Sequence, residues 1–211
     1  MPNKIKRWIF NHFRDNFIIY FIVTILFFIG IIIGSITIKL LEPEKINGIM
    51  LFLNSLFKSI NSDGINNITV LKQSLADNYR AIFIIWISST IFIGLIIVPA
   101  IILFKGFALG FSVGFFVNEY GLKGFLFSVL GIFSQNIFII PGIISISSIS
   151  LAFTINNIRK RKIRSRNNNF VSAFIDYSLL TMLFSVLVLI GCLIEAYLTP
   201  VFMKSFIDYL S

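Results

Sequence analysis

Hydrophobic residues in this chain are gathered in long blocks and are not spread at the spacing of a soluble core. A helix needs about 20 predominantly apolar residues to cross the hydrocarbon core of a bilayer, and most of the blocks reach that length. The pattern therefore predicts an all-α fold, a polytopic integral membrane helix bundle with about five transmembrane helices in one membrane domain, 1–211. The predicted membrane helices cover residues 17–40, 81–104, 106–122, 124–155 and 171–198.

Two of these blocks have lengths that do not suit one straight helix. Residues 106–122 reach only the lower limit for a crossing, so they form either a short transmembrane helix or one arm of a re-entrant hairpin. Residues 124–155 would make a helix about 48 Å long, and Pro141-Gly142 predicts a break within it. Pro99 predicts a kink near the end of the second block.

The polar segments between the blocks also carry helical patterns. Residues 1–16 separate basic from apolar side chains on two helical faces, which predicts a basic interfacial helix. Residues 42–80 are expected to form an extracytoplasmic amphipathic loop, with a surface helix, a turn at Asn61–Gly64 and a second helix over 69–80. Spacings of three and four mark the apolar stripe of the surface helix: Ile46, Ile49, Met50, Leu53, Leu56, Phe57 and Ile60.

Basic residues predict the orientation of the bundle. The chain has 18 Lys and Arg against 9 Asp and Glu, and the basic loop 156–169 holds six cations and no acid. The positive-inside rule places this loop and the N-terminus in the cytoplasm, whereas the charge-balanced segment 42–80 is placed outside. Four crossings between the two basic segments keep both on one side. Five crossings then leave the C-terminus outside.

Composition excludes an ordinary soluble protein. Hydrophobic residues make up 57% of the chain and charged residues 13%, whereas soluble domains contain about 25% charged residues. The polar remainder is too small for a soluble catalytic domain. Cations beside a membrane helix usually anchor topology on anionic lipids, so we expect membrane lipids as partners and no nucleic acid.

The supply of reactive side chains argues against an enzyme. His12 is the only histidine and Cys192 the only cysteine, so neither an intrachain disulfide nor a Cys/His zinc site is possible. The sequence has no H-E-x-x-H motif, no histidine to serve a serine nucleophile and no pair of intramembrane acids at helical spacing. We expect no catalytic residues, no metal and no other cofactor.

A repeat of small residues indicates where two helices pack closely. Gly106, Gly110 and Gly114 are spaced at four residues and share one helical face. A face without side chains lets a second helix approach closely, so these positions are predicted to serve helix packing. A phosphate-binding loop is excluded, because no strand precedes the glycines and no GK[ST] sequence follows them.

Polar residues inside apolar blocks, together with positions in the closing segment, are the candidates for a polar site or for contact with a partner. They are Lys105, Gln135, Asn136, Pro141, Glu195, Tyr197 and Pro200. Gln135 and Asn136 precede Pro141 within the fourth block and must face protein or water. They form either an interhelical hydrogen bond or part of a polar cavity opened by the break at Pro141. Glu195 lies close to the outer interface, so its carboxylate is either functional or in contact with the interface.

Several motifs, taken in order, resemble the stage II sporulation protein M family. They are the basic helix Lys4–Arg14, the segment 104–115 with Lys105, the Gln135-Asn136 pair before Pro141, and the closing segment 195–200 with Tyr197 and Pro200. The likeness covers nearly the whole chain. Ser134 stands where the family tends to carry proline.

The resemblance implies a non-enzymatic membrane protein of endospore-forming bacteria, located in the mother-cell membrane at the sporulation septum and needed for engulfment of the forespore. It also implies two partners, the cell-wall hydrolases stage II sporulation proteins D and P. A small membrane transporter or channel is the alternative function. A cavity open to water on one side would favour transport, whereas a closed bundle with an exposed groove on the outer side would favour a scaffold.

Overall fold

The computed structural model describes residues 2–63, 66–162 and 170–202, and all regular structure in this part of the chain is helical. The predicted all-α fold class is confirmed. A five-residue π-helix, η1 (Ser128–Ile132), connects two of the α-helices. The α-helices are α1 (Pro2–Asp15), α2 (Phe17–Leu40), α3 (Pro43–Asp63), α4 (Asn67–Thr90), α5 (Gly94–Phe127), α6 (Phe133–Lys162) and α7 (Phe170–Tyr197).

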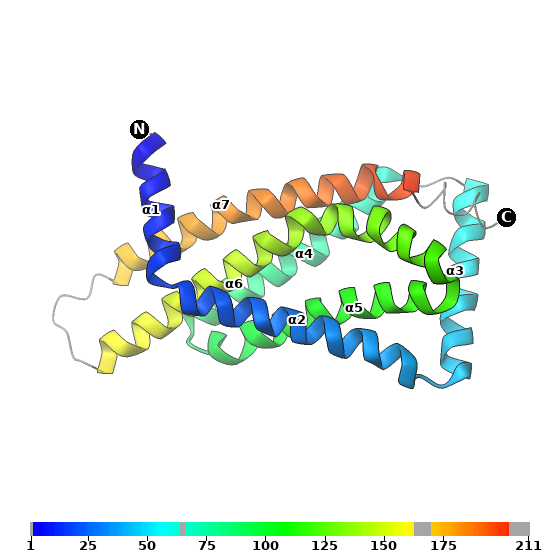
Figure 1. Cartoon of the computed structure of the whole chain (residues 1–211). Coiled ribbons are helices and arrows are strands. Elements are labelled where there is room, and N and C mark those ends of the chain that lie inside the picture. Colours follow the sequence, from blue (N-terminus) through cyan, green and yellow to red (C-terminus); the bar gives the residue numbers. More distant parts are fainter. Residues whose placement is uncertain (1, 64–65, 163–169, 203–211) are drawn as a thin grey trace.

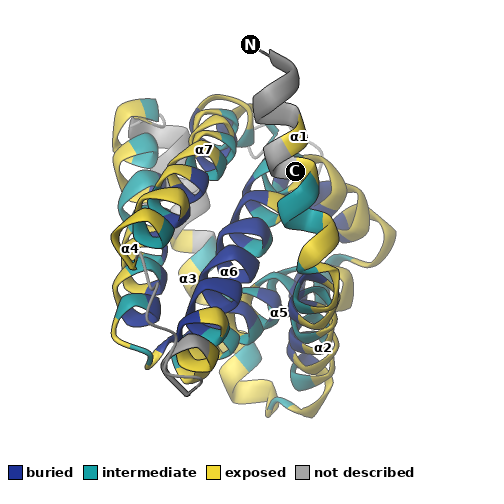
Figure 2. Ribbon diagram, turned by 90° about the vertical axis from the view of Figure 1, so that its left-hand side faces the viewer, coloured by how far each residue is buried: buried dark blue, intermediate teal, exposed yellow. Residues whose placement is uncertain are grey.

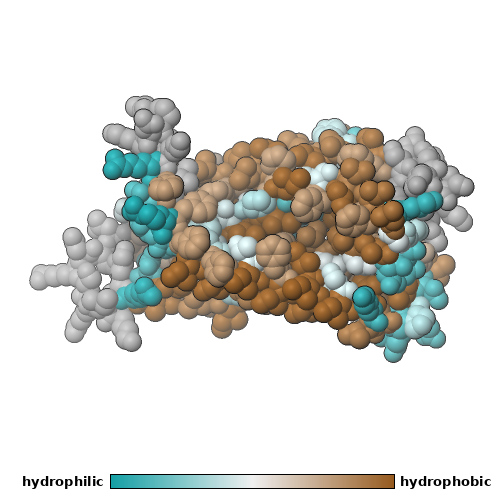
Figure 3. All heavy atoms as spheres, viewed as in Figure 1, coloured by the Kyte–Doolittle hydropathy of each residue, from teal (hydrophilic) through white to brown (hydrophobic). Residues whose placement is uncertain are grey.

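The long helices α2, α4, α5, α6 and α7 run lengthwise with alternating direction, while α1 and α3 lie across opposite ends of the bundle (Figure 1). Their number agrees with the predicted number of crossings. Length and composition alone make three stretches suitable for spanning a membrane: Phe17–Leu40, Gly94–Arg159 and Phe170–Phe202. A hydrophobic band covers the middle of the visible face, and hydrophilic atoms gather toward both ends (Figure 3).

The prediction of a single membrane helix over 81–104 is wrong. The chain reverses between α4 and α5, where Phe92 has a φ of 68°. The helix before the reversal, α4, starts at Asn67, inside the segment expected to be an outer loop. The helix after it starts at Gly94, so residues 106–122 belong to a longer helix and not to a re-entrant arm. The turn itself is apolar, which is why the hydrophobic pattern continues across it.

A second reversal occurs within α5. Gly121 has a φ of 55° and a ψ of −129°, a conformation that is accessible to glycine and strained for other residues. The chain then returns through η1 into α6 (Figure 1). The break predicted at Pro141 is absent, since α6 is helical on both sides of this exposed residue. Packing against neighbouring helices holds a membrane helix together despite one missing hydrogen bond. Pro99 lies near the start of α5 and not near the end of a crossing.

Helix α3 lies across the end of the bundle through one apolar face. Ile46, Ile49, Met50 and Leu53 pack against a cluster of buried side chains from α2 and α5. The helix continues to Asp63, past the start of the predicted turn, and residues 64–65 lie outside the described residues, as do the side chains of Leu56, Phe57 and Ile60. Asn66 caps α4, because its side-chain oxygen accepts a hydrogen bond of 3.0 Å from the backbone of Ile68.

Helix α6 forms the centre of the bundle. Figure 2 shows it buried along much of its length between the other helices. Small polar side chains make this close packing possible, and Thr154 donates a hydrogen bond of 3.0 Å to the backbone oxygen of Ser89 on α4. The buried serines of α6 are Ser145, Ser147, Ser148 and Ser150.

The two ends of the bundle are only partly described. Arg159, the first cation of the predicted basic loop, is exposed near the end of α6. The side chains of Lys160 to Lys162, the rest of that loop and the tail beyond Phe202 lie outside the described residues. Helix α1 is present where a basic helix was predicted, and it turns across the bundle axis (Figure 1).

Candidate functional site

The three predicted packing glycines lie on the face of α5 that contacts α2. A methyl group on Gly106 would overlap the carbonyl oxygen of Phe27, and one on Gly110 would overlap that of Ile31. A methyl group on Gly114 would lie 3.2 Å from the Cα atom of Ser35. The two backbones are therefore in direct contact along α5.

Helix α2 contributes its own small residues to this glycine interface. Gly30 and Gly34 face the backbone of α5, where a methyl group would overlap the carbonyl oxygens of Leu103 and Phe107. Ser35 then donates a hydrogen bond of 3.0 Å across the interface to the carbonyl oxygen of Gly110. Gly30 and Gly34 are four residues apart, as the glycines of α5 are, and the sequence analysis did not predict that these two helices pack together.

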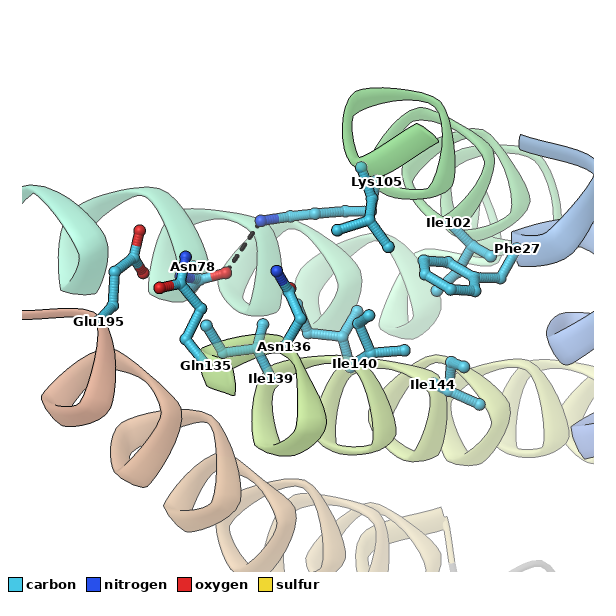
Figure 4. Close-up of a pocket in the computed structure, with 12 residues that line it drawn as sticks. Phe27, Asn78, Ile102, Lys105, Gln135, Asn136, Ile139, Ile140, Ile144 and Glu195 are labelled. Carbon is cyan, nitrogen blue, oxygen red and sulfur yellow. Dashed lines mark hydrogen bonds between the residues drawn. The ribbon is translucent and has the colours of Figure 1, made fainter. Parts of the chain in front are cut away.

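A cavity of about 130 Å³ lies among the lengthwise helices, beside the glycine interface. Its lining is polar toward one end and apolar toward the other (Figure 4). The apolar part is formed by Phe27, Ile102, Leu109, Ile139, Ile140, Ile143 and Ile144, and the polar part by Asn78, Lys105, Gln135, Asn136 and Glu195. We refer to it as the interior cavity.

Lys105 extends from α5 toward α4 and donates a hydrogen bond of 2.9 Å from its Nζ atom to the side-chain oxygen of Asn78 (Figure 4). Asn78 is almost fully buried, and its amide nitrogen donates to the backbone oxygen of Ser74 at 3.0 Å. The same nitrogen lies 3.6 Å from the sulfur of Cys192 on α7. Lys105 is thus held by an amide that also joins α4 to α7.

Glu195 points into the bundle from α7. Its carboxylate accepts a hydrogen bond from the hydroxyl of Ser74 on α4. It lines the same cavity as Lys105, yet the two charged groups form no direct ion pair among the described contacts. Glu195 was a candidate for contact with the outer interface or a partner, and the structure turns it inward.

Gln135 and Asn136 occupy the start of α6 at the polar part of the cavity. The side-chain oxygen of Gln135 accepts a hydrogen bond from the hydroxyl of Thr199, which also donates to the backbone of Gly131 at 3.3 Å. Asn136 donates to the backbone oxygen of Ile132 at 2.7 Å. Gln135 makes the hydrogen bond between segments that the first reading expected. Both residues also line a polar cavity, but the break at Pro141 that was expected to open it is absent.

The remaining candidate positions are not part of the cavity. Pro141 and Tyr197 are exposed, and Pro200 is buried just beyond the end of α7. The structure thus brings together four of the predicted polar positions, Lys105, Gln135, Asn136 and Glu195, and leaves these three apart.

The arrangement combines one cation, one carboxylate and several amides in a space with room for several water molecules. It can bind water or a small polar solute and can join four helices through hydrogen bonds. Among the described residues, no three side chains of the types His, Cys, Asp and Glu come together as they would in a metal site.

Two residues of this site, Ser74 and Asn78, were missed because they fall in the segment expected to be an outer loop. A signal for them does exist in the sequence. The buried residues Ser74, Asn78, Ile82 and Ile85 recur at spacings of three and four, so one helical face continues from the polar segment into the apolar block. Extending that periodicity backwards would have placed both residues inside the bundle.

A second cavity, of about 200 Å³, lies at the end of the bundle that carries α1. His12, Asn157 and Asp176 are among its lining residues. The His12 Nε2 atom and the Asn157 Nδ2 atom are buried and have no hydrogen-bond partner within the described part of the chain. Burial lowers the pKa of His12, and nearby Asp15 opposes that shift, so the imidazole is neutral at pH 7.

Comparison with known proteins gives one match. The family model described as Stage II sporulation protein M matches residues 23–200, which is most of the chain. The match includes the glycine interface and the interior cavity. No curated protein and no solved structure matches the chain.

Proposed function

The chain belongs to the stage II sporulation protein M family, and from this premise we propose that it is a non-enzymatic membrane scaffold in engulfment of the forespore. Membership of the family makes it a sporulation-related membrane protein. The finer proposal is that it holds peptidoglycan hydrolases, the stage II sporulation proteins D and P, at the mother-cell membrane of the septum. The hydrolases carry out the chemistry, and this chain supplies their attachment.

The observation that carries the proposal is the position of α3. This helix lies across one end of the bundle and packs through its Ile46 and Met50 face. On the opposite side it exposes Leu51 and Phe52, whose side chains are 72% and 62% accessible. An exposed apolar pair on an amphipathic helix that packs against the bundle is suited to binding a partner protein.

Charge supports the orientation that the proposal needs. Arg159 belongs to the last turns of α6, and this end of α6 lies at the end of the bundle opposite α3. The positive-inside rule puts the basic segment that contains Arg159 in the cytoplasm. Helix α3 would then face the compartment that contains peptidoglycan. Glu195 points into the bundle, and its carboxylate is already hydrogen-bonded to Ser74. We therefore place the contact with the hydrolases on α3 and not at Glu195.

The test is affinity purification from sporulating cells that carry tagged variants in place of the wild-type protein. We expect Leu51→Ser combined with Phe52→Ser to recover much less hydrolase than the wild type. Leu122→Ser is the matched control, because Leu122 is also exposed, at 76%, and follows the turn at Gly121. Equal recovery with the α3 variant and the control would contradict the proposal, provided that both variants accumulate in the membrane.

A second candidate function, a small transporter or channel, is favoured by the interior cavity. A cation and a carboxylate inside a membrane bundle are characteristic of solute or proton pathways. Its test is solute or proton flux across liposomes that contain the purified protein. Flux that depends on Lys105 and Glu195 would favour transport over the scaffold.

A further inference from the structure

One face of α4 is polar and exposed. Lys72, Gln73, Asp77 and Arg80 are all exposed on this helix. Gln73 donates a hydrogen bond of 3.0 Å to the carboxylate of Asp77, and Arg80 forms neither a hydrogen bond nor an ion pair with any described residue. We call Gln73, Asp77 and Arg80 the charged stripe of α4.

Contacts with α7 fix the level of the stripe along the bundle. Asn78 contacts Cys192, and Trp86 donates to the hydroxyl of Ser178 at 3.2 Å. Arg80 lies between Asn78 and Trp86 on α4, so it is level with the part of α7 between those two contacts. That part of α7 carries no charged residue.

The charged stripe therefore reaches the level of the apolar spans. Arg80 lies in the middle part of α4 (Asn67–Thr90), and Asp77 lies about one turn closer to the end of α4 that follows α3. The exposed residues of the neighbouring helices at this depth are apolar, for example Phe104 of α5 and Val186 of α7, which are 69% and 52% accessible. Lipid is a suitable neighbour for those side chains.

Lipid is an unsuitable neighbour for the charged stripe. Arginine and aspartate are among the least favourable residues within a membrane helix, and those found there face protein or water. A second protein surface that brings a carboxylate would satisfy Arg80 at this depth. The stripe itself contains a carboxylate, because Asp77 precedes Arg80 by three residues, or about 4.5 Å along the helix axis.

We propose that the charged stripe of α4 is the contact surface between two copies of this chain in the membrane. A two-fold axis along the membrane normal sets α4 beside α4 of the second copy in parallel orientation. In this arrangement equivalent residues lie at the same depth, and the long side chain of Arg80 in each copy reaches about 4.5 Å along the helix axis to Asp77 of the other copy. The stripe is self-complementary, and this favours a second copy over a different protein.

The test uses charge exchange between two differently tagged copies in native membranes. The variant D77R carries two cations on its stripe, and R80D carries two anions, so each should self-associate less than the wild type by more than about tenfold. Co-expressed, D77R and R80D should recover association with each other. The double variant D77R/R80D keeps the composition of the stripe and should associate with itself, which also shows that the exchanged charges permit folding.

A matched cysteine experiment locates the contact. In a Cys192→Ser background, Gln73→Cys on the stripe should form a disulfide-linked dimer on oxidation, whereas Phe28→Cys on the lipid-facing side of α2 should not. Failure of D77R to associate with R80D, when both accumulate and melt as the wild type does, would overturn the proposal. So would labelling of Arg80→Cys by a membrane-impermeant thiol reagent, because the stripe would then face water. Stoichiometric recovery of a different membrane protein in place of the second copy would also overturn it.

Discussion

The ammonium group of Lys105 on α5 is hydrogen-bonded to the side-chain oxygen of Asn78 on α4 at 2.9 Å, inside the bundle. Asn78 reaches α7 through Cys192, and Glu195 of α7 reaches α4 through Ser74. Polar groups in an apolar interior are tolerated only when they are hydrogen-bonded, so this network specifies how α4, α5 and α7 assemble.

Replacing Asn78 alone should lower the free energy of unfolding more than replacing Asn78 and Lys105 together. Asn78→Leu leaves the Lys105 cation without its acceptor, and we expect it to lower the free energy of unfolding by about 2–4 kcal/mol. Adding Lys105→Met should restore part of that loss. Reversible unfolding in detergent micelles measures both effects, with Asn118→Leu as an exposed control. Strictly additive effects of the two substitutions would contradict the coupling.

A single added methyl group in the glycine interface should destabilise the protein. Gly110→Ala forces the Cβ atom onto the carbonyl oxygen of Ile31, and we expect a loss of about 1–3 kcal/mol and a lower melting temperature. Gly48→Ala is the matched control on α3, because its methyl group would meet nothing within 4 Å. That variant should be neutral or slightly stabilising, since alanine favours a helix over glycine. Equal melting temperatures for the two variants would rule out close backbone contact at Gly110.

Acidification should weaken the packing of α1 against the rest of the bundle. The pKa of His12 is lowered from 6.5 by burial, so a proton binds more readily when α1 leaves the bundle. The stabilisation from neutral His12 is present above pH 6.5 and is lost as the pH falls through the lowered pKa. Hydrogen exchange of α1 amides, corrected for intrinsic rates, should therefore be faster at about pH 5 than at about pH 7.5. His12→Asn should remove this difference, and a difference that persists in the variant would assign it to another group.

Impermeant thiol labelling tests the orientation of the chain. In a Cys192→Ser background, Asn47→Cys on the exposed side of α3 should be labelled in intact cells. Ser165→Cys, in the basic loop outside the described residues, should be labelled only after the membrane is permeabilised. The opposite pattern would place the basic loop outside the cell.

The sequence was sufficient to predict the fold class and the number of lengthwise helices, because long apolar blocks and two basic segments constrain both. It also indicated the α5 side of the glycine interface from the spacing of Gly106, Gly110 and Gly114. The bounds of α2 match the predicted block 17–40. These features depend on the length of apolar blocks, the spacing of residues and the distribution of charge, all of which can be read directly from a sequence.

The turn at Phe92 and the polar residues that α4 places in the interior cavity could not be predicted in the same way. A non-glycine residue with positive φ gives no local signal, so one apolar block was read as one helix. The segment that contains Ser74 and Asn78 carries nearby charges, which hydropathy assigns to water, whereas its buried face contributes to the interior cavity. The neighbours of Lys105 and Glu195 follow from tertiary packing and could not be read from spacing.

The most direct test of the scaffold proposal is flotation of hydrolases with liposomes that contain the purified chain. Soluble domains of the stage II sporulation proteins D and P should float with vesicles that carry the wild-type chain. They should remain at the bottom of the gradient with empty vesicles or with vesicles that carry the Leu51→Ser and Phe52→Ser variant. Vesicles with the chain alone should release no soluble fragments from purified peptidoglycan. Hydrolases that bind wild-type and empty vesicles equally, or fragments released by the chain alone, would contradict the account.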